Sequence, residues 1–230
     1  MRVVVNAAMS VDGKLSSRRR DQIEISGVED FDRVDRLRAE SDGILVGVGT
    51  VLADDPHLTL DASGQVAARE AQDEAGNPAR IVADSTARTP PDARILDDTA
   101  ETYILVSSAA PSDRVDALED AGATVLTAGD ERVDLTAGLA ALEERGIEAL
   151  MVEGGGEVIF SLFEAGLVDE LSVYIAPMII GGAEAPTLVD GAGFTEGFPQ
   201  LTLQTIDRFD TGVLLRFAVE EESNRSGRLD

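Results

Sequence analysis

Short apolar runs alternate with stretches of helical periodicity over the first two thirds of the chain. Such runs predict buried strands, and apolar positions that recur every three or four residues predict amphipathic helices. The expected strands cover residues 3–5, 43–48, 80–83, 103–106, 124–126 and 149–152, and the expected helices cover 26–41, 112–121, 135–145 and a last segment ending at 165. This alternation predicts an α/β fold with a mixed, mostly parallel sheet and helices on both faces.

Local signals refine these elements. Ser26, with Glu29 three residues later, has the form of a capping box at a helix start, and Gly146 is typical of a helix end. Residues 50–56 predict a short helix after the second strand. Residues 61–79 are polar with little periodicity, so a solvated loop is expected there.

The last third of the chain changes character. Residues 170–176, 201–207 and 212–219 are expected strands with no helix of comparable length between them, which predicts antiparallel pairing. No internal repeat and no linker divides the sequence. Residues 1–220 are therefore expected to form a single domain, and residues 221–230 a polar tail.

The net charge excludes two classes of partner. The 230-residue chain has 44 acidic and 19 basic residues and a formal charge of −25, so it repels nucleic acid and anionic membranes. No apolar run approaches the roughly 20 residues that span a bilayer. A cytoplasmic protein is expected.

Cysteine and histidine usage excludes further chemistry. The chain has no cysteine and one histidine, His57, which rules out disulfides, a thiolate nucleophile and a cysteine-ligated zinc. His57 is interpreted as a loop residue. We expect no metal site.

The basic residues carry a sharper signal, because 18 of the 19 are Arg and one, Lys14, is Lys. A dense acidic surface with almost no lysine is typical of halophilic proteins, in which molar salt screens the self-repulsion. The retained Lys14, in the Asp12-Gly13 turn, indicates a role for an ammonium that the planar fork of Arg does not fill.

Two glycine-rich strand ends are candidate binding elements. Glu153 and the Gly154, Gly155 and Gly156 turn precede a helix, which suits either an anion site or a simple tight turn, and the spacing is not a dinucleotide fingerprint. In residues 47–56, Thr50 could donate its hydroxyl to a phosphate or a ribose, and Asp54 could accept from a ribose hydroxyl or an amide, although Thr50 is also a plausible helix N-cap. Two such ends at one sheet edge favour a cleft.

Five ordered blocks resemble the riboflavin-biosynthesis reductase family of the C-terminal RibD type. They are residues 6–14 (NAAMSVDGK), 47–56 (GVGTVLADDP), 80–85 (RIVADS), 153–156 (EGGG) and 167–171 (LVDEL), which leads to 177–182 (PMIIGG). The resemblance implies a dihydrofolate-reductase-like three-layer fold and a homodimer. It also implies NADPH-dependent reduction, with NADH possible, of a ribosylaminopyrimidine 5′-phosphate to the ribitylamino compound. Because the zinc ligands of the fused deaminase are absent, it is similar to the free-standing archaeal and fungal enzymes that act on 2,5-diamino-6-ribosylamino-4(3H)-pyrimidinone 5′-phosphate.

The resemblance also implies site residues. The cofactor would contact Ala8, Thr50, Asp54, Ser85, Gly154, Gly155 and Gly156, and the substrate would contact Lys14, Arg38, Leu58 and Glu153. Lys14 and Glu153 would be the catalytic residues, with Glu153 accepting from the pyrimidine amino groups and Lys14 acting near the sugar. Asp61 departs from the pattern, because family members often carry Arg there. Either Arg38 and other donors hold the phosphate, or the register shifts.

Two alternatives stay open at this point. The same fold hosts reductases that act on a pterin or a folate, so the fold alone does not set the substrate. The chain could also be a non-catalytic nucleotide-binding regulator that retains the cleft.

Overall fold

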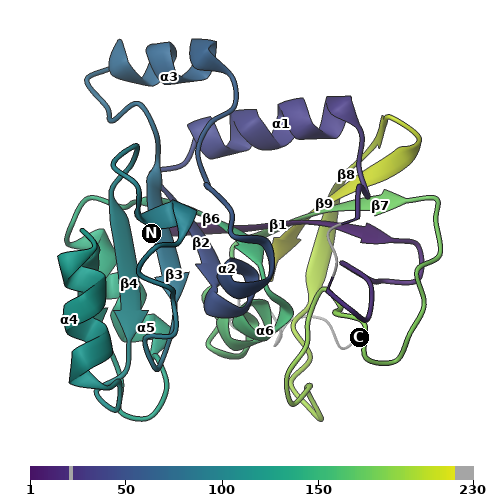
Figure 1. The fold of residues 1–230 in the computed structure, drawn as a ribbon. Coiled ribbons are helices and arrows are strands. Elements are labelled where there is room, and N and C mark those ends of the chain that lie inside the picture. The colour runs from purple at the N-terminus through teal and green to yellow at the C-terminus, as the bar shows by residue number, and fades with distance from the viewer. Residues whose placement is uncertain (21–22, 221–230) are drawn as a thin grey trace.

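A computed structural model of the chain describes residues 1–20 and 23–220, so the tail expected at 221–230 lies outside the described residues. Within them, nine strands form one mixed sheet in the order β5-β4-β3-β2-β6-β1-β7-β9-β8 (Figure 1). The strands are β1 (Arg2–Ser10), β2 (Gly43–Gly47), β3 (Ala79–Ala83), β4 (Thr102–Val106), β5 (Thr124–Thr127), β6 (Ala149–Gly154), β7 (Glu170–Ala176), β8 (Leu201–Phe209) and β9 (Gly212–Val219).

Helices connect the parallel strands. They are α1 (Val28–Ala39), α2 (Val48–Asp54), α3 (Ser63–Glu70), α4 (Ser112–Asp120), α5 (Leu135–Glu143) and α6 (Gly156–Glu164), with a short 3-10 turn η1 (Arg94–Leu96). Gly146 follows α5 with a φ of +88°, and the next N–H donates back to the carbonyl of Leu142, so glycine ends this helix as predicted. None of the helices in the described part of the chain has the length and apolar character needed to cross a membrane.

The core explains why these residues form strands. One row of paired, buried side chains crosses five adjacent strands and packs against α5 and α6: Val5, Val152, Leu45, Ile81 and Tyr103. Successive residues of a strand point to opposite faces. Val46, Val82 and Ile104 therefore form a second row, which packs with α2 and α4.

Helix α1 lies on the same face as α2 and α4. Arg33, buried on α1, donates to the Asn6 side chain on β1 at 2.9 Å, to Ser172 on β7 at 3.3 Å and to Asp30 at 2.8 Å. Asn6 is adjacent to Val5 and so points away from α5 and α6. Strands β1 to β7 run parallel, and β9 pairs antiparallel with both β7 and β8. The predicted mixed sheet with two covered faces and antiparallel C-terminal strands is confirmed.

The predicted capping box at α1 is wrong. Gly27 is the N-cap residue, and no side chain next to it caps the helix. Asp210, in the β8–β9 turn, instead accepts from the N–H groups of Glu29 and Asp30, both at 3.2 Å, and the Glu29 carboxylate accepts from the Asp210 N–H at 2.8 Å. A carboxylate from a distant hairpin thus satisfies the free donors at the helix start.

The loop expected at 61–79 is also wrong, because this segment contains α3, which packs against α1 on the side away from the sheet (Figure 1). The buried Arg69 of α3 donates to the carbonyl of Ala39 at the end of α1, at 2.8 Å. Asp35 of α1 accepts from the N–H of Asp61 at 2.7 Å. Side chains of the two helices therefore satisfy backbone groups at the end of α1 and in the segment before α3, a stabilisation that local periodicity does not reveal.

Candidate active site

The candidate site lies along one edge of the sheet. Parallel strands place their carboxyl ends together, and β3, β2, β6 and β1 are consecutive neighbours. Each strand ends in or leads into a segment that carries an expected site residue. In the same order, these residues are Ser85, Thr50, Glu153 and Lys14. The topology therefore brings together the segments that the sequence singled out one by one.

The glycine turn between β6 and α6 is shaped for close approach. Gly154 has a φ of +138°, a region that favours glycine. A Cβ on Gly155 would lie 3.6 Å from the Thr50 hydroxyl oxygen, and a Cβ on Gly156 would lie 2.6 Å from a carboxylate oxygen of Asp190. The Thr50 hydroxyl thus lies beside the backbone at the start of α6, and a helix N-terminus is a place that suits a phosphate group.

The alternative role of Thr50 as an N-cap is wrong. Helix α2 begins at Val48 with Gly47 as its N-cap, so Thr50 sits inside the first turn. Its hydroxyl is not needed to cap the helix and is available to a ligand beside the glycine turn.

Arg38 and Glu153 form a two-point ion pair. Arg38 Nε lies 2.6 Å from Glu153 Oε1 and Nη2 lies 2.8 Å from Oε2, while Nη1 donates to the carbonyl of Thr59 at 2.9 Å. The two side chains are only 19% and 14% exposed. Burial opposes the charge of Arg38, but the paired carboxylate of Glu153 raises the pKa of Arg38 above its ordinary value. The two expected substrate contacts are thus brought together as one unit.

Glu153 and Ala8 share the face of the sheet that α1 covers. Val5 pairs with Val152, so Ala8 lies about two residues beyond the level of Glu153 on the neighbouring strand. The strand rise and spacing put their backbones about 8 Å apart. A bound molecule can touch both.

Lys14 is held away from that ion pair. Its Nζ donates to the carbonyl of Ala185 at 3.1 Å, and its backbone forms a bridge with Thr187. No hydrogen bond or ion pair joins it to Glu153 within residues 1–20 and 23–220. An ammonium has three N–H donors, so Lys14 retains donors for a ligand.

Asp12 organises the turn that carries Lys14. Its carboxylate accepts from the Ser10 hydroxyl at 2.6 Å and from the N–H groups of Ile180 and Gly181 at 3.1 and 2.7 Å. The Ser10 hydrogen bond, followed by the backbone donors, lowers the pKa of Asp12 to about 2. The carboxylate thereby ties the turn after β1 to the loop after β7.

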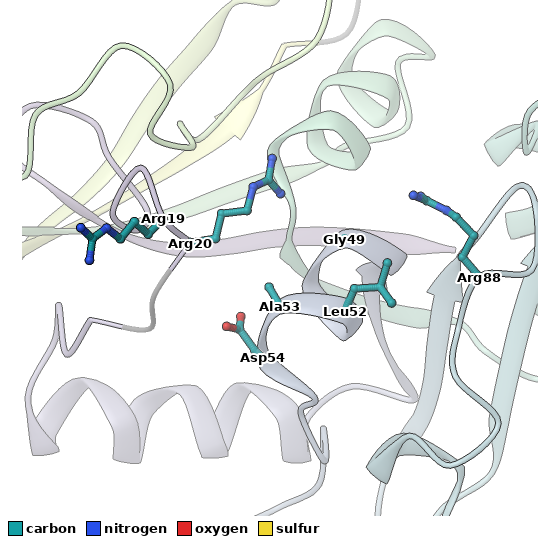
Figure 2. Close-up of a pocket in the computed structure, with 7 residues that line it drawn as sticks. All are labelled: Arg19, Arg20, Gly49, Leu52, Ala53, Asp54 and Arg88. Atoms are coloured by element: carbon teal, nitrogen blue, oxygen red, sulfur yellow. The ribbon is translucent and has the colours of Figure 1, made fainter.

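An open pocket of about 670 Å³ lies over the exposed side of α2 and is called the basic pocket here. Its lining residues are Arg19, Arg20, Gly49, Leu52, Ala53, Asp54 and Arg88. Figure 2 shows Arg20 and Arg88 on opposite sides of Gly49 and Leu52. Arginines concentrated in a chain of formal charge −25 favour an anionic ligand. Asp54 also lines this pocket, and desolvation raises the pKa of its carboxyl.

A second pocket of about 430 Å³, called the apolar pocket, lies at the start of α1. Its lining residues are Ala8, Leu15, Ile23, Glu24, Ile25, Ser26 and Phe31. The Phe31 side chain is half exposed, and Arg38 lies seven residues further on the same face of α1, about 10 Å away. Described residues of the segment between β1 and α1 line both pockets.

Two expected contacts are placed differently from the others. The side chain of Leu58 is buried at 4% exposure in the core with α2, so a ligand can meet only its backbone. The Ser85 hydroxyl accepts from the N–H of Val133 at 3.0 Å and does not line the basic pocket. His57 is in a loop, as predicted, where its Nε2 accepts from Arg94 at 2.9 Å.

Sequence reasoning missed the arginines of the basic pocket. Arg20 and Arg88 lie in connecting segments without periodicity, and each follows a block that the sequence had marked. The sequence did offer one indication of these residues. Each is an arginine that follows a motif at a strand end, in a chain that is otherwise strongly acidic. Among residues 1–20 and 23–220, no group of three or more His, Cys, Asp or Glu side chains is arranged to hold a metal ion.

Comparison with known proteins gives a consistent result. The profile of the RibD C-terminal domain matches residues 1–215. The chain is 45% identical over 223 residues to the 2,5-diamino-6-ribosylamino-4(3H)-pyrimidinone 5′-phosphate reductase of Archaeoglobus fulgidus, covering 97% of this chain and 98% of that protein. It is 50% identical over 194 residues to the protein of the same name from Methanothermobacter thermautotrophicus, covering 84% and 86%.

A solved structure is similar to the whole fold. The pyrimidine reductase-like protein from Corynebacterium diphtheriae has a TM-score of 0.82, covering 96% of this chain and 92% of its own. Because the two sequences are 21% identical, this likeness concerns the fold, and it confirms the expected dihydrofolate-reductase-like arrangement.

Proposed function

The chain belongs to the RibD C-terminal domain family, and we propose on this premise that it reduces 2,5-diamino-6-ribosylamino-4(3H)-pyrimidinone 5′-phosphate with NADPH. The product is the ribitylamino compound, an intermediate on the way to riboflavin. The observation that carries the proposal is the sheet edge itself, where the Arg38–Glu153 pair, the glycine turn and the basic pocket adjoin.

The reaction converts a sugar carbon from an imine to an amine. The ribose ring opens to give a C1′=N bond, C1′ receives a hydride, and the nitrogen receives a proton, which leaves a CH₂–NH linkage. The reduced nicotinamide supplies the hydride when it is bound. The residues of the chain must hold the two molecules face to face, exclude water and deliver the proton.

Glu153 is the residue proposed to bind the amino groups of the pyrimidine. A carboxylate has about four acceptor positions, and the Arg38 pair occupies one on each oxygen. The remaining positions accept from ring amino groups without loss of the ion pair. Arg38 therefore fixes the orientation of the acceptor before the substrate arrives, which lowers the ordering cost of binding.

Lys14 is proposed to act near the sugar. It lies in the turn after β1, the strand that carries Ala8, and its contact with Ala185 fixes the ammonium while leaving donors free. A cation there stabilises negative charge on the opened sugar or relays the proton that the imine nitrogen takes up.

The cofactor is proposed to lie along the edge from β1 to β3. Its nicotinamide would lie against the backbone near Ala8 in the apolar pocket, and its phosphates would contact Thr50 and the glycine turn. That turn is proposed for a phosphate because it begins a helix and lies beside the Thr50 hydroxyl. Asp54 and Ser85 would contact the more distant half of the cofactor.

A homodimer is proposed from an apolar face of the last two strands. Leu201, Leu203 and Ile206 of β8 are 38%, 47% and 63% exposed. They share a face with Phe217, which packs on the core through Leu171. A long edge strand with an apolar face requires cover, and a second copy supplies it. Ile206→Asp should reduce the mass measured by light scattering to that of a monomer, whereas Thr205→Asp, on the opposite face, should not.

We also propose that the enzyme is one reductase domain over residues 1–220, works in the cytoplasm and is adapted to salt. Its charged substrate and cofactor do not cross membranes unaided. The formal charge of −25 destabilises the compact state when it is not screened. The free energy of unfolding should therefore rise steeply between 0.1 M and 2 M KCl, as the Debye length falls from about 10 Å to below about 3 Å. No change over this range would contradict the salt adaptation.

The function is tested by the absorbance of reduced nicotinamide. Purified protein in molar KCl receives NADPH with either the diaminopyrimidine ribosylamino phosphate or dihydrofolate. Loss of absorbance with the first compound alone supports the proposal. Loss with dihydrofolate alone, or no loss with either compound from folded protein, refutes it.

A further inference from the structure

Among residues 1–20 and 23–220, one buried carboxylate oxygen accepts no hydrogen bond. Asp84 directly follows β3 and is fully buried. Its Oδ2 accepts from the N–H and the hydroxyl of Thr89, at 2.7 and 2.8 Å. Its Oδ1 accepts no hydrogen bond from any of the described residues. A buried carboxylate oxygen left without a donor is costly, so its surroundings need an explanation.

The nearest cation is Arg88 of the basic pocket. Its Nε stands 4.0 Å from Asp84 Oδ1, beyond hydrogen-bond distance, and its side chain is 54% exposed. The guanidinium has two usable edges. The Nε edge lies nearest the Asp84 carboxylate. Arg88 also lines the basic pocket (Figure 2), and no hydrogen bond to another described residue occupies its second edge.

The sheet order shows which part of a dinucleotide reaches Arg88. Ala8 stands on β1, and the glycine turn and Thr50 follow β6 and β2, with Arg20 beside Gly49. Arg88 follows β3, three strand spacings from β1, or about 14 Å. With the nicotinamide near Ala8 and the diphosphate near the glycine turn, the adenosine ribose is the part that reaches β3.

We propose that Arg88 binds the 2′-phosphate of the cofactor and that Asp84 positions Arg88 for this contact. The inference rests on the proposed function and adds the residues that select NADPH over NADH. When the phosphate binds, Arg88 closes the short gap to Asp84 Oδ1 and bridges two anions with its two edges. Without Arg88, the charge of Asp84 would disfavour a phosphate in the same place.

Binding of cofactor fragments tests this without catalysis. Adenosine 2′,5′-bisphosphate and AMP differ by the 2′-phosphate, and calorimetry measures both affinities in wild type and variants. Arg88→Ala should weaken the bisphosphate about 10- to 100-fold and leave AMP within about twofold. Arg88→Lys keeps the charge but not the second hydrogen-bonding edge. Its affinity for the bisphosphate should lie between those of wild type and Arg88→Ala. Arg114→Ala removes an exposed arginine nearby, which donates to Thr86, and should change neither affinity.

Asp84→Asn tests the positioning role. It keeps a carbonyl oxygen for Thr89 but loses the charge that faces Arg88, and it should weaken the bisphosphate severalfold with AMP unchanged. In an Arg88→Ala background the same change should have no further effect, because Asp84 acts through Arg88. If Asp84→Asn does not fold, as judged by its circular dichroism spectrum, the Arg88 series still decides the phosphate contact, since Arg88 is exposed.

The outcomes separate this inference from the proposed function. An unchanged bisphosphate-to-AMP ratio in Arg88→Ala, or tighter bisphosphate binding in Asp84→Asn, overturns the inference even if the enzyme reduces its substrate. A selective loss in Arg88→Ala supports it even if no substrate is reduced. In active enzyme, the ratio of kcat/KM for NADPH to that for NADH should fall in parallel.

Discussion

The Arg38–Glu153 pair should dominate the stability of the site. Arg38→Leu leaves the Glu153 carboxylate, 14% exposed, without its two charge-assisted donors at 2.6 and 2.8 Å. Removal of one partner of a largely buried pair costs about 3–5 kcal/mol. For a domain of this size, that lowers the melting temperature by about 6–20 °C.

Replacement of both partners should restore most of the lost stability. In Arg38→Leu/Glu153→Leu no buried charge is left unpaired, so the double variant should lie within about 1 kcal/mol of wild type. Urea denaturation of the four proteins gives the coupling energy, which should exceed about 2 kcal/mol. Activity should stay lost in all three variants, because the acceptor for the pyrimidine is missing or misplaced.

The exposed pair of Arg2 and Glu170 is the matched control. Its Nη2 and Oε1 are 2.8 Å apart, but the side chains are 55% and 45% exposed. Its coupling should be about 0–1 kcal/mol and should shrink between 0.1 M and 2 M KCl, whereas the inner pair should change little. Equal coupling energies for the two pairs would refute the reasoning.

Three further changes test other parts of the structure. The pKa of Asp12, lowered to about 2, means that its carboxylate stabilises the fold above its unfolded pKa of about 3.9 and loses this effect as the pH falls toward 2. Thermal melts should show that Asp12→Asn is less stable than wild type at pH 6 and that the difference shrinks as the pH falls toward 2, and a constant difference would contradict this. Gly156→Val should weaken NADPH binding by calorimetry, because a Cβ meets Asp190 at 2.6 Å; unchanged affinity would count against the glycine turn as a binding element. Arg80→Met should lose about 3–5 kcal/mol in urea denaturation, because the fully buried guanidinium pairs with Asp97 at 2.7 Å; a loss below about 1 kcal/mol would argue against this role.

The strands and most helices were predictable because the local pattern of apolar and polar residues indicates which side chains are buried. Residues such as Val5 and Leu45 alternate with residues of the opposite face, and α5 ends at a glycine that needs a positive φ. Two features depend on distant partners. Asp210 caps α1 from 180 residues away along the chain, and Arg69 holds α3 against the end of α1. Neither contact leaves a periodic pattern.

The site was predictable in its segments and not in its contacts. The resemblance marked Arg38 and Glu153 separately, and only the fold shows that they form one unit. Asp84 lies in a marked block, but its unpartnered oxygen depends on how the loop to Thr89 folds. Arg88 lies in a connecting segment, where sequence pattern carries little information about geometry.

The most direct test of the central claim follows the hydride itself. NADPH carrying deuterium at the transferred position of its nicotinamide is incubated with the diaminopyrimidine substrate, and the product is analysed by mass spectrometry and NMR. The proposed reaction predicts one deuterium per product molecule, located at C1′ of the ribityl chain. Product without deuterium, or with deuterium on the pyrimidine ring, would contradict hydride transfer to the opened sugar.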